Sequence, residues 1–157
     1  LVNSAGVLTN GEDWKRMIDV NFTGLVRTTL KAIDLMGKHK GGKGGTIINI
    51  SSMAGLTPVI YYPIYAATKH AIVGLTNSLA VKLVLKNTHT YTTFSDLYKN
   101  NYSFVLIFHF HRPECVAKAI IRLMEKEGNG AICLVHDAQP PYIVNVQTID
   151  NLVKRPF

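Results

Sequence analysis

The sequence predicts an α/β fold in which helices alternate with strands buried in a parallel sheet. Thr46–Ile50 is too continuously apolar to alternate, which is typical of a strand covered on both faces. Amphipathic helical patterns come before and after it, an order typical of a doubly wound sheet. With 157 residues, 47% of them hydrophobic and 17% charged, the chain can build one domain with a real core.

The first helix is expected between the end of a short strand (residues 1–4) and a glycine-rich stretch (residues 37–45). Asn10 or Gly11 can cap it, with acidic residues following in the first turn, where negative charge is favoured. An apolar stripe then recurs at broadly helical spacing: Met17, Val20, Leu25, Thr28, Ala32, Leu35 and Met36.

Two further helices are expected. Pro63 suits the first turn of a helix that continues to about Lys86. Pro113 begins another, which Gly128 ends, with an apolar face turned inward. Small residues recur along the helix that starts at Pro63, and they favour close packing against another helix, such as one from a partner subunit.

The last part of the chain is less regular. Ala131–Val135 is predicted to be the final strand, and Gln139–Pro141 is predicted to begin an irregular tail. Residues 87–111 break the pattern, being rich in aromatic residues and free of Gly, Ala, Glu and Pro. Ser103–Phe110 favours a strand through its β-branched and aromatic residues. Two interpretations of the segment stay open: an insertion foreign to the fold, and a divergent native loop.

The net charge of +7 raises nucleic acid as a partner. The basic residues are dispersed, however, and the one cluster is Lys38, Lys40 and Lys43 among glycines, which favours a solvated loop and predicts no nucleic-acid binding. Cys115 and Cys133 lack metal-ligand spacing, so both are interpreted as reduced and buried, which suits the cytoplasm.

Membrane insertion and metal binding are not predicted. The longest apolar run, Phe104–Phe108, is far too short to span a bilayer, and there is no secretory signal. His109 and His111 alternate on a possible strand and could face one side as ligands, but no third ligand lies nearby.

Tyr65 and Lys69 carry the clearest chemical signal. Four residues apart on a helix, they lie on one face with Cβ atoms about 5–6 Å apart. A lysine ammonium at that distance favours the phenolate and lowers the tyrosine pKa from about 10, which makes Tyr65 a candidate general acid/base. Ser52, at the end of the preceding strand, could hold the same substrate oxygen. Taken alone, the pair also fits an ordinary surface helix.

Four segments in order resemble the short-chain dehydrogenase/reductase family: Leu1–Gly6, Asp19–Gly24 with Asn21, Thr46–Ser52, and Tyr65–Lys69. The resemblance covers residues 1–86 and, more weakly, 113–145. The glycine-rich residues 37–45 and Asn129–Ile132 look like the branch containing insect alcohol dehydrogenase and 15-hydroxyprostaglandin dehydrogenase.

The resemblance implies a Rossmann-like fold and a role for each residue of the tetrad. Tyr65 would transfer the proton, and Lys69 would assist it and bind the nicotinamide ribose. Ser52 would position the substrate alcohol or ketone oxygen. Taken alone, Ser52 could equally be a strand-end cap, and Ser51 competes for the role, although the spacing to Tyr65 favours Ser52. Asn21 would hold a water that links Lys69 to solvent; without the family, a polar residue at a helix kink explains Asn21 equally well.

The resemblance also implies binding residues. Asn3, Ala5 and Gly6 match the turn beside the cofactor, although Ser4 replaces an expected asparagine. Tyr62 would line the substrate pocket, although plain packing is an equally good explanation for it. The implied cofactor is NAD, with NADP not excluded.

A glycine-rich strand–turn–helix for the dinucleotide is not found in residues 1–157. We therefore expect a single, incomplete dehydrogenase domain, a doubly wound parallel sheet lacking its N-terminal half. Its parts would be a catalytic core (1–86), an aberrant segment (87–112) and a C-terminal helix, strand and tail (113–157).

The expected function is oxidoreduction between a secondary alcohol and a ketone, with an alcohol or a hydroxy-lipid such as a prostaglandin as substrate. We expect the chain as printed to be inactive and the complete protein to form a homodimer or homotetramer. The alternative is a non-enzymatic relative that acts only through dimerisation or scaffolding.

Overall fold

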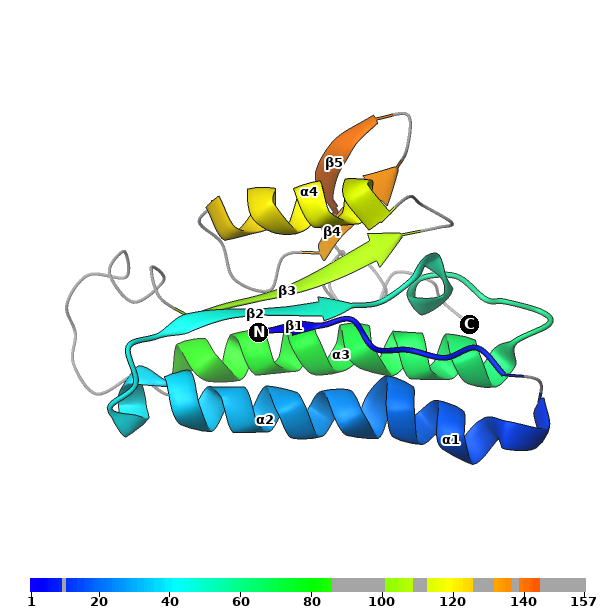
Figure 1. The fold of residues 1–157 in the computed structure, drawn as a ribbon, viewed down its shortest axis with the longest axis horizontal. Coiled ribbons are helices and arrows are strands. Elements are labelled where there is room, and N and C mark those ends of the chain that lie inside the picture. The colour runs from blue at the N-terminus through cyan, green and yellow to red at the C-terminus, as the bar shows by residue number, and fades with distance from the viewer. Residues whose placement is uncertain (10, 86–100, 109–112, 126–131, 137–138, 145–157) are drawn as a thin grey trace, which may run out of the picture.

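The computed structural model describes residues 1–157 except 10, 86–100, 109–112, 126–131, 137–138 and 145–157 (Figure 1). Its centre is a five-stranded sheet in the order β1-β2-β3-β4-β5. The first four strands run parallel, and β5 is antiparallel to β4. The strands are β1 (Val2–Asn3), β2 (Gly45–Ile50), β3 (Asn101–Phe108), β4 (Ile132–His136) and β5 (Gln139–Val144). The predicted α/β class with a Rossmann-like parallel sheet is confirmed.

Helices cover both faces of this sheet. One face carries α2 and α3, and the other carries α4 (Figure 1). The helical elements are η1 (Gly11–Asp13), α1 (Trp14–Ile18), η2 (Asp19–Gly24), α2 (Leu25–Met36), η3 (Lys38–Lys40), η4 (Met53–Gly55), α3 (Pro63–Leu85) and α4 (Pro113–Glu125). The three helices expected from the sequence therefore form close to their predicted bounds.

A π-helical turn interrupts the first helix. The segments α1, η2 and α2 follow one another without a break, but η2 is a six-residue π turn. Its residue Asn21 is fully buried. A π turn shifts the faces of a helix and is frequent at functional sites. The interruption coincides with Asn21, whose side chain lies inside the protein.

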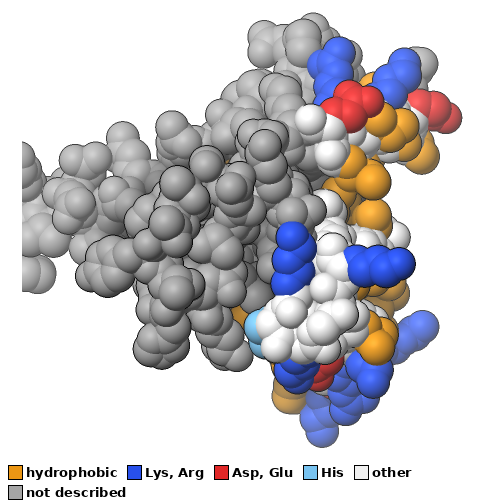
Figure 2. Space-filling view, turned by 90° about the vertical axis from the view of Figure 1, so that its left-hand side faces the viewer, with side chains coloured by type: hydrophobic (Ala, Val, Ile, Leu, Met, Phe, Trp, Pro, Cys, Tyr) orange, Lys and Arg blue, Asp and Glu red, His pale blue; other side chains and the backbone are white. Residues whose placement is uncertain are grey.

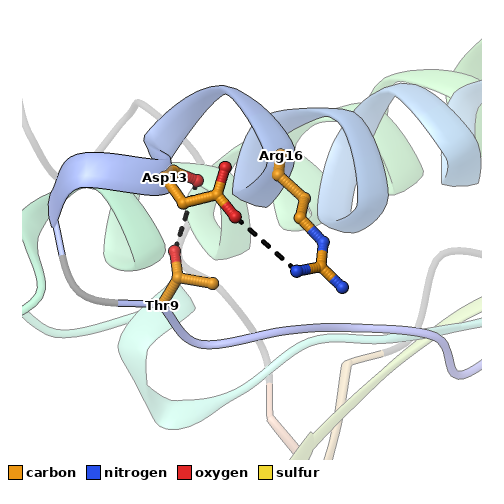
Figure 3. Close-up of polar contacts among 3 residues, drawn as sticks. All are labelled: Thr9, Asp13 and Arg16. Carbon is orange, nitrogen blue, oxygen red and sulfur yellow. Dashed lines mark hydrogen bonds and ion pairs between the residues drawn. The ribbon is translucent and has the colours of Figure 1, made fainter.

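Asp13, the residue before α1, makes no side-chain capping hydrogen bond to the helix. Thr9 Oγ1 donates to the Asp13 carbonyl at 3.3 Å, and Arg16 pairs with the Asp13 carboxylate at 3.6 Å (Figure 3). Both members of the ion pair are well exposed, and exposed pairs of this kind contribute little to stability. Of the two expected caps, Asn10 lies outside the described residues and Gly11 begins η1.

The two faces of β2 contact different layers. Ile48 and Ile50 join Ala119, Cys133 and Val135 in an apolar cluster beneath α4. The strand is therefore buried on both faces as predicted, because Ile47 and Asn49, which point the other way, are buried as well. Cys133 is buried as expected, but Cys115 is only partly buried, since it lies on α4 at the margin of the cluster.

The expectation of an irregular tail from Gln139 is wrong. Gln139–Val144 forms β5, paired antiparallel with β4 and with an irregularity near His136. Prolines are tolerated there because β5 is the edge strand, where one row of N–H groups has no partner strand to serve.

The aberrant segment contributes a central strand. β3 lies at Asn101–Phe108, close to the predicted 103–110, and pairs in parallel with both β2 and β4. Residues 87–100 and 109–111 of the segment, with His109 and His111 among them, lie outside the described residues.

Candidate active site

The candidate site forms where the chain leaves the parallel strands. The turn after β1, the turn after β2, η2 and the first turns of α3 meet at this end of the sheet, at the right of Figure 1. Ligands of open α/β sheets bind at the carboxyl ends of the strands. The four segments singled out in the sequence, at residues 1–6, 19–24, 46–52 and 65–69, belong to these elements.

Lys69 is the buried charge of this site. Its side chain is only 5% exposed, and its ammonium donates to the Ile50 carbonyl at 3.3 Å. The Lys69 nitrogen lies 5.5 Å from the centre of the Tyr65 ring. Removal from water disfavours the charged form, and this burial lowers the pKa of Lys69 to about 8. The predicted i, i+4 pairing of Tyr65 and Lys69 on one helix face is therefore present.

Asn21 ties three segments together through its side-chain amide. Its oxygen accepts from the Val7 N–H at 2.7 Å, and its nitrogen donates to the Val7 carbonyl at 2.9 Å. The same nitrogen lies 3.4 Å from the Thr68 hydroxyl, which itself donates to the Tyr65 carbonyl at 2.7 Å. Asn21 thus fixes the turn after β1 against α3, and the water-holding role expected for it stays a prediction.

Gly6 leaves space beside the lysine. A Cβ atom placed there would lie 3.6 Å from Lys69 Nζ and 3.5 Å from Asn21 Oδ1. Gly6 and Ala5 are both exposed. The turn after β1 therefore offers an open backbone surface next to a buried ammonium.

The two adjacent serines have different environments. Ser51 is fully buried and donates to the Lys69 carbonyl at 3.0 Å. Ser52 is partly exposed and accepts from the Ala54 N–H at 3.2 Å, which caps η4. Because a hydroxyl that accepts one hydrogen bond still has its proton to donate, Ser52 can bind a further acceptor, and its expected substrate role stays a prediction.

The side chain of Asn3 points inward. Its nitrogen donates to Thr29 at 3.0 Å and to Asn49 at 2.8 Å, while its oxygen accepts from Thr28 at 2.7 Å. Asn49 in turn donates to Thr76 of α3 at 2.8 Å. This network joins α2, β1, β2 and α3, and the cofactor contact expected of Asn3 stays a prediction.

Two tyrosines stand on the loop before α3. Tyr61 is 85% exposed and Tyr62 is 40% exposed. The Tyr62 carbonyl accepts from Ala66 N–H at 2.9 Å, close to the start of the helix. Tyr62 is thus placed one turn before Tyr65, which is compatible with its expected place at a substrate pocket.

Three features of the candidate site were not predicted from the sequence: Thr68, Gly55 and the contact of Ser51 with Lys69. Thr68 directly precedes Lys69 in the motif, so the sequence itself could have indicated a hydroxyl next to the lysine. Gly55 and the Ser51–Lys69 contact depend on how η4 packs against α3, and no local sequence pattern predicts that packing.

Among the described residues on the face turned towards the viewer in Figure 2, several Lys and Arg side chains gather near the lower edge. Other Lys and Arg side chains stand higher on this face, some with acidic side chains beside them. Within the residues that the structure describes, no group of His, Cys, Asp and Glu could hold a metal ion. The described helices include none that combines the length and the apolar character needed to cross a membrane.

Comparison with known proteins identifies related chains. Residues 1–94 match the family model described as short chain dehydrogenase. The mouse 15-hydroxyprostaglandin dehydrogenase [NAD(+)] is 31% identical over an alignment that covers 100% of this chain and 67% of that protein. The human protein of the same name is 46% identical over 55% of this chain and 32% of that protein. The chain thus spans about two thirds of the mouse relative and about one third of the human one.

A solved structure supports the fold. The short chain dehydrogenase from Mycobacterium avium superposes with a TM-score of 0.73 and 22% identity, covering 94% of this chain and 55% of that chain. An identity this low shows the fold alone. The family model matches more than half of the chain, and the alignment with the mouse relative covers all of this chain. The chain therefore belongs to the short-chain dehydrogenase family.

Proposed function

We propose that this chain carries the catalytic residues of a nicotinamide-dependent oxidoreductase that interconverts a secondary alcohol and a ketone, with NAD as the cofactor and a hydroxy-lipid as the substrate. The observation that carries the proposal is the pair of Tyr65 and buried Lys69, with 5.5 Å between the ammonium and the ring centre. The pair lies at the carboxyl end of β2, beside the open turn at Gly6.

The chemistry that this site can perform is proton transfer to or from a hydroxyl. The Tyr65 phenol would exchange the proton with the substrate oxygen, and the Lys69 ammonium would stabilise the negative charge that develops on the phenol oxygen. Ser52 would donate its free hydroxyl proton to the same substrate oxygen, which fixes the reacting carbon in place.

The residues beside Lys69 fit a nicotinamide nucleotide. The buried ammonium has three donors, and within the described residues it makes one hydrogen bond, at 3.3 Å, to the Ile50 carbonyl; a ribose hydroxyl could accept another. The backbone of Asn3, Ala5 and Gly6 would line the same space. When bound, the nicotinamide supplies the hydride acceptor or donor. NAD is favoured over NADP because the names of the mouse and human relatives carry NAD(+).

The substrate proposal rests on the same relatives, which are named for a prostaglandin hydroxyl group. Exposed apolar surface next to the site suits a lipid chain: Ile60 is 88% exposed, Tyr61 85% and Tyr62 40%. Tyr62, the member nearest to Tyr65 in the chain, would contact the substrate.

The test uses the natural protein at its full length. Oxidation of a 15-hydroxyprostaglandin and of a short secondary alcohol is followed by NADH absorbance, with NADP in place of NAD as a parallel assay. We expect turnover with NAD and a higher kcat/KM for the lipid. Saturating binding of NADH without turnover of any alcohol would contradict the catalytic part of the proposal.

Gly6→Ala tests the cofactor position. The methyl group would make ordinary contacts with Asn21 and Lys69, so the fold should persist while the space beside the ammonium is filled. We expect NADH to bind more weakly, as measured by its fluorescence. Gly74→Ala is the matched control, because a Cβ at Gly74 meets no atom within 4 Å.

A second candidate function, association without catalysis, rests on the exposed sides of α2 and α3. Leu30 is 48% exposed and Leu35 66% exposed on α2, and α3 exposes the small residues Ala67, Gly74 and Ser78. These sides suit a second copy of the chain, as a homodimer or as part of a homotetramer. Leu35→Glu should lower the mass measured by sedimentation, while Ile60→Glu should not.

A further inference from the structure

We infer that Ser51 and Gly55 are positioning residues for Lys69: the Ser51 hydroxyl holds the lysine backbone against the end of β2, at a contact that only glycine at position 55 permits. The inference deepens the proposed function, on which its catalytic meaning rests. Ser52 remains the serine assigned to the substrate.

The position of Lys69 has to be imposed by its surroundings. Its side chain is 5% exposed and its ammonium donates to the Ile50 carbonyl at 3.3 Å. An ammonium loses hydration when it is buried, and a lysine side chain loses much rotamer freedom when it is fixed. Both terms favour a lysine that swings out to water, so something must keep the start of this side chain in place.

Ser51 provides that restraint. It is fully buried, and its Oγ donates to the Lys69 carbonyl at 3.0 Å across 18 residues of sequence. Ile50, the preceding residue, accepts from the other end of the same lysine. Two consecutive residues at the end of β2 therefore hold both the backbone and the ammonium of Lys69.

Gly55 makes this contact possible. A Cβ atom at position 55 would lie 2.5 Å from Ser51 Oγ, 2.8 Å from the Lys69 carbonyl oxygen and 3.0 Å from the Lys69 carbonyl carbon. Any side chain there would have to push apart the two atoms that form the hydrogen bond. Since two of these three atoms are backbone, the strain could not be relieved by rotating a flexible side chain.

The same short segment presents the substrate serine. Ser52 caps η4 by accepting from Ala54 N–H, and Gly55 ends η4 against Lys69. Residues 50–55 thus fix Ser52 relative to Lys69, and Tyr65 is the titratable side chain that the structure places beside the ammonium. If the contact of Ser51 and Gly55 with Lys69 were loosened, Lys69 and Ser52 could move independently.

The test measures the ionisation of Lys69 directly, in the natural protein at its full length. Lysine labelled at Cε is titrated by NMR, and the Lys69 signal is assigned by its loss in Lys69→Met. The variants are Ser51→Ala and Gly55→Ala. Their matched controls are Ser78→Ala, whose hydroxyl also donates to an α3 carbonyl but at an exposed site, and Gly74→Ala, whose Cβ would meet open space.

We expect Lys69 to titrate near 8 in the parent and in both controls. In Ser51→Ala and Gly55→Ala its pKa should rise by about one unit, a tenfold change in proton affinity, because the freed ammonium gains water. An unchanged Lys69 pKa in both variants would overturn the inference. Loss of the folded state in both variants, with both controls folded, would also overturn it, because the contact would then hold the fold and not the lysine.

Cofactor and substrate are absent from this titration, so its outcome does not depend on the proposed reaction. Where turnover is measured, Ser51→Ala should lower kcat more than it changes KM. The substrate-binding surface is intact in that variant and only the alignment of the proton-transfer pair is disturbed.

Discussion

The two faces of strand β2 show how one strand can serve stability and chemistry separately. Ile48 and Ile50 face α4 and join a dry apolar cluster. Asn49 faces the other way, and it and Ser51, the residue just after the strand, are equally buried. The side chains of both make hydrogen bonds to other segments. Because side chains alternate along a strand, the chemistry on one face does not interrupt the packing on the other.

The polar face carries costs that the apolar face avoids. Each buried polar group there needs a partner, since an unsatisfied donor or acceptor costs more than a made hydrogen bond gains. The compensation is directional: hydrogen bonds fix Asn3, Asn49 and Lys69 in single orientations, whereas apolar contacts tolerate repacking. Precise positioning near the site therefore comes from the polar face, and bulk stability comes from the apolar one.

Tyr65→Phe should have the largest effect of the four substitutions, and this effect should fall on turnover and not on stability. Removal of the phenol should lower turnover about 10²- to 10⁴-fold, while the thermal midpoint hardly moves because the ring remains. Alcohol oxidation with NAD and a thermal melt measure the two quantities. Tyr61→Phe, on a ring that is 85% exposed, is the control; equal losses in both variants would remove Tyr65 from the mechanism.

Ile48→Ala should lower the free energy of unfolding and leave the chemistry of the site unchanged. Ile48 is 1% exposed in the apolar cluster, and removing such a side chain destabilises a protein by about 2–5 kcal/mol. Denaturant unfolding should show this loss, with the pKa of Lys69 unchanged in the folded protein. Ile60→Ala, at an 88% exposed position, should stay within about 0.5 kcal/mol of the parent. A change in the Lys69 pKa would mean that the two faces are coupled.

Lys69→Met should stabilise the protein, because it removes a buried charge. The pKa of Lys69 is lowered from 10.5 to about 8. Below pH 8 the folded and unfolded states both hold the proton, so the cost of the buried charge is fully present. Between pH 8 and 10.5 only the unfolded state binds it, and the stability of the parent rises with pH.

At 1.36 kcal/mol per pKa unit the gain at pH 7 has an upper bound of about 3–4 kcal/mol. Denaturant unfolding of parent and variant across pH should show a difference that fades between pH 8 and 10.5, and turnover should fall. Lys31→Met, at an exposed position, should show no such pH dependence. A difference that stays constant with pH would mean that the charge is not the source of the gain.

Thr76→Val should have the smallest effect of the four. The Thr76 hydroxyl accepts from Asn49 at 2.8 Å and donates to the Ile72 carbonyl. Valine keeps the shape but leaves the Asn49 donor buried without this acceptor, at a cost of about 1–3 kcal/mol. Thr57→Val, an exposed threonine that also donates to a carbonyl, is the control, and unfolding by denaturant is the measurement. A stabilised Thr76→Val would show that the polar network is dispensable.

Local sequence determined much of the fold and the outline of the site. Pro63 and Pro113 begin α3 and α4, while the predicted stop at Gly128 lies outside the described residues. The apolar run at Thr46–Ile50 forms a strand buried on both faces. The Tyr65–Lys69 pairing follows from helix geometry alone, because residues four apart lie on one face. These features depend on short-range periodicity, which can be recognised in the sequence without knowing which segments meet in space.

Tertiary structure decided the rest. The π turn at Asn21, the edge strand β5 and the clamp of Ser51 and Gly55 on Lys69 each depend on which segments meet in space. Whether Asn3 turns its side chain to a cofactor or into the protein was decided by Asn49 and Thr29, which lie 46 and 26 residues away in the chain. Contacts at such separations leave no local pattern, because each partner is chosen by packing and by the need to satisfy buried polar groups.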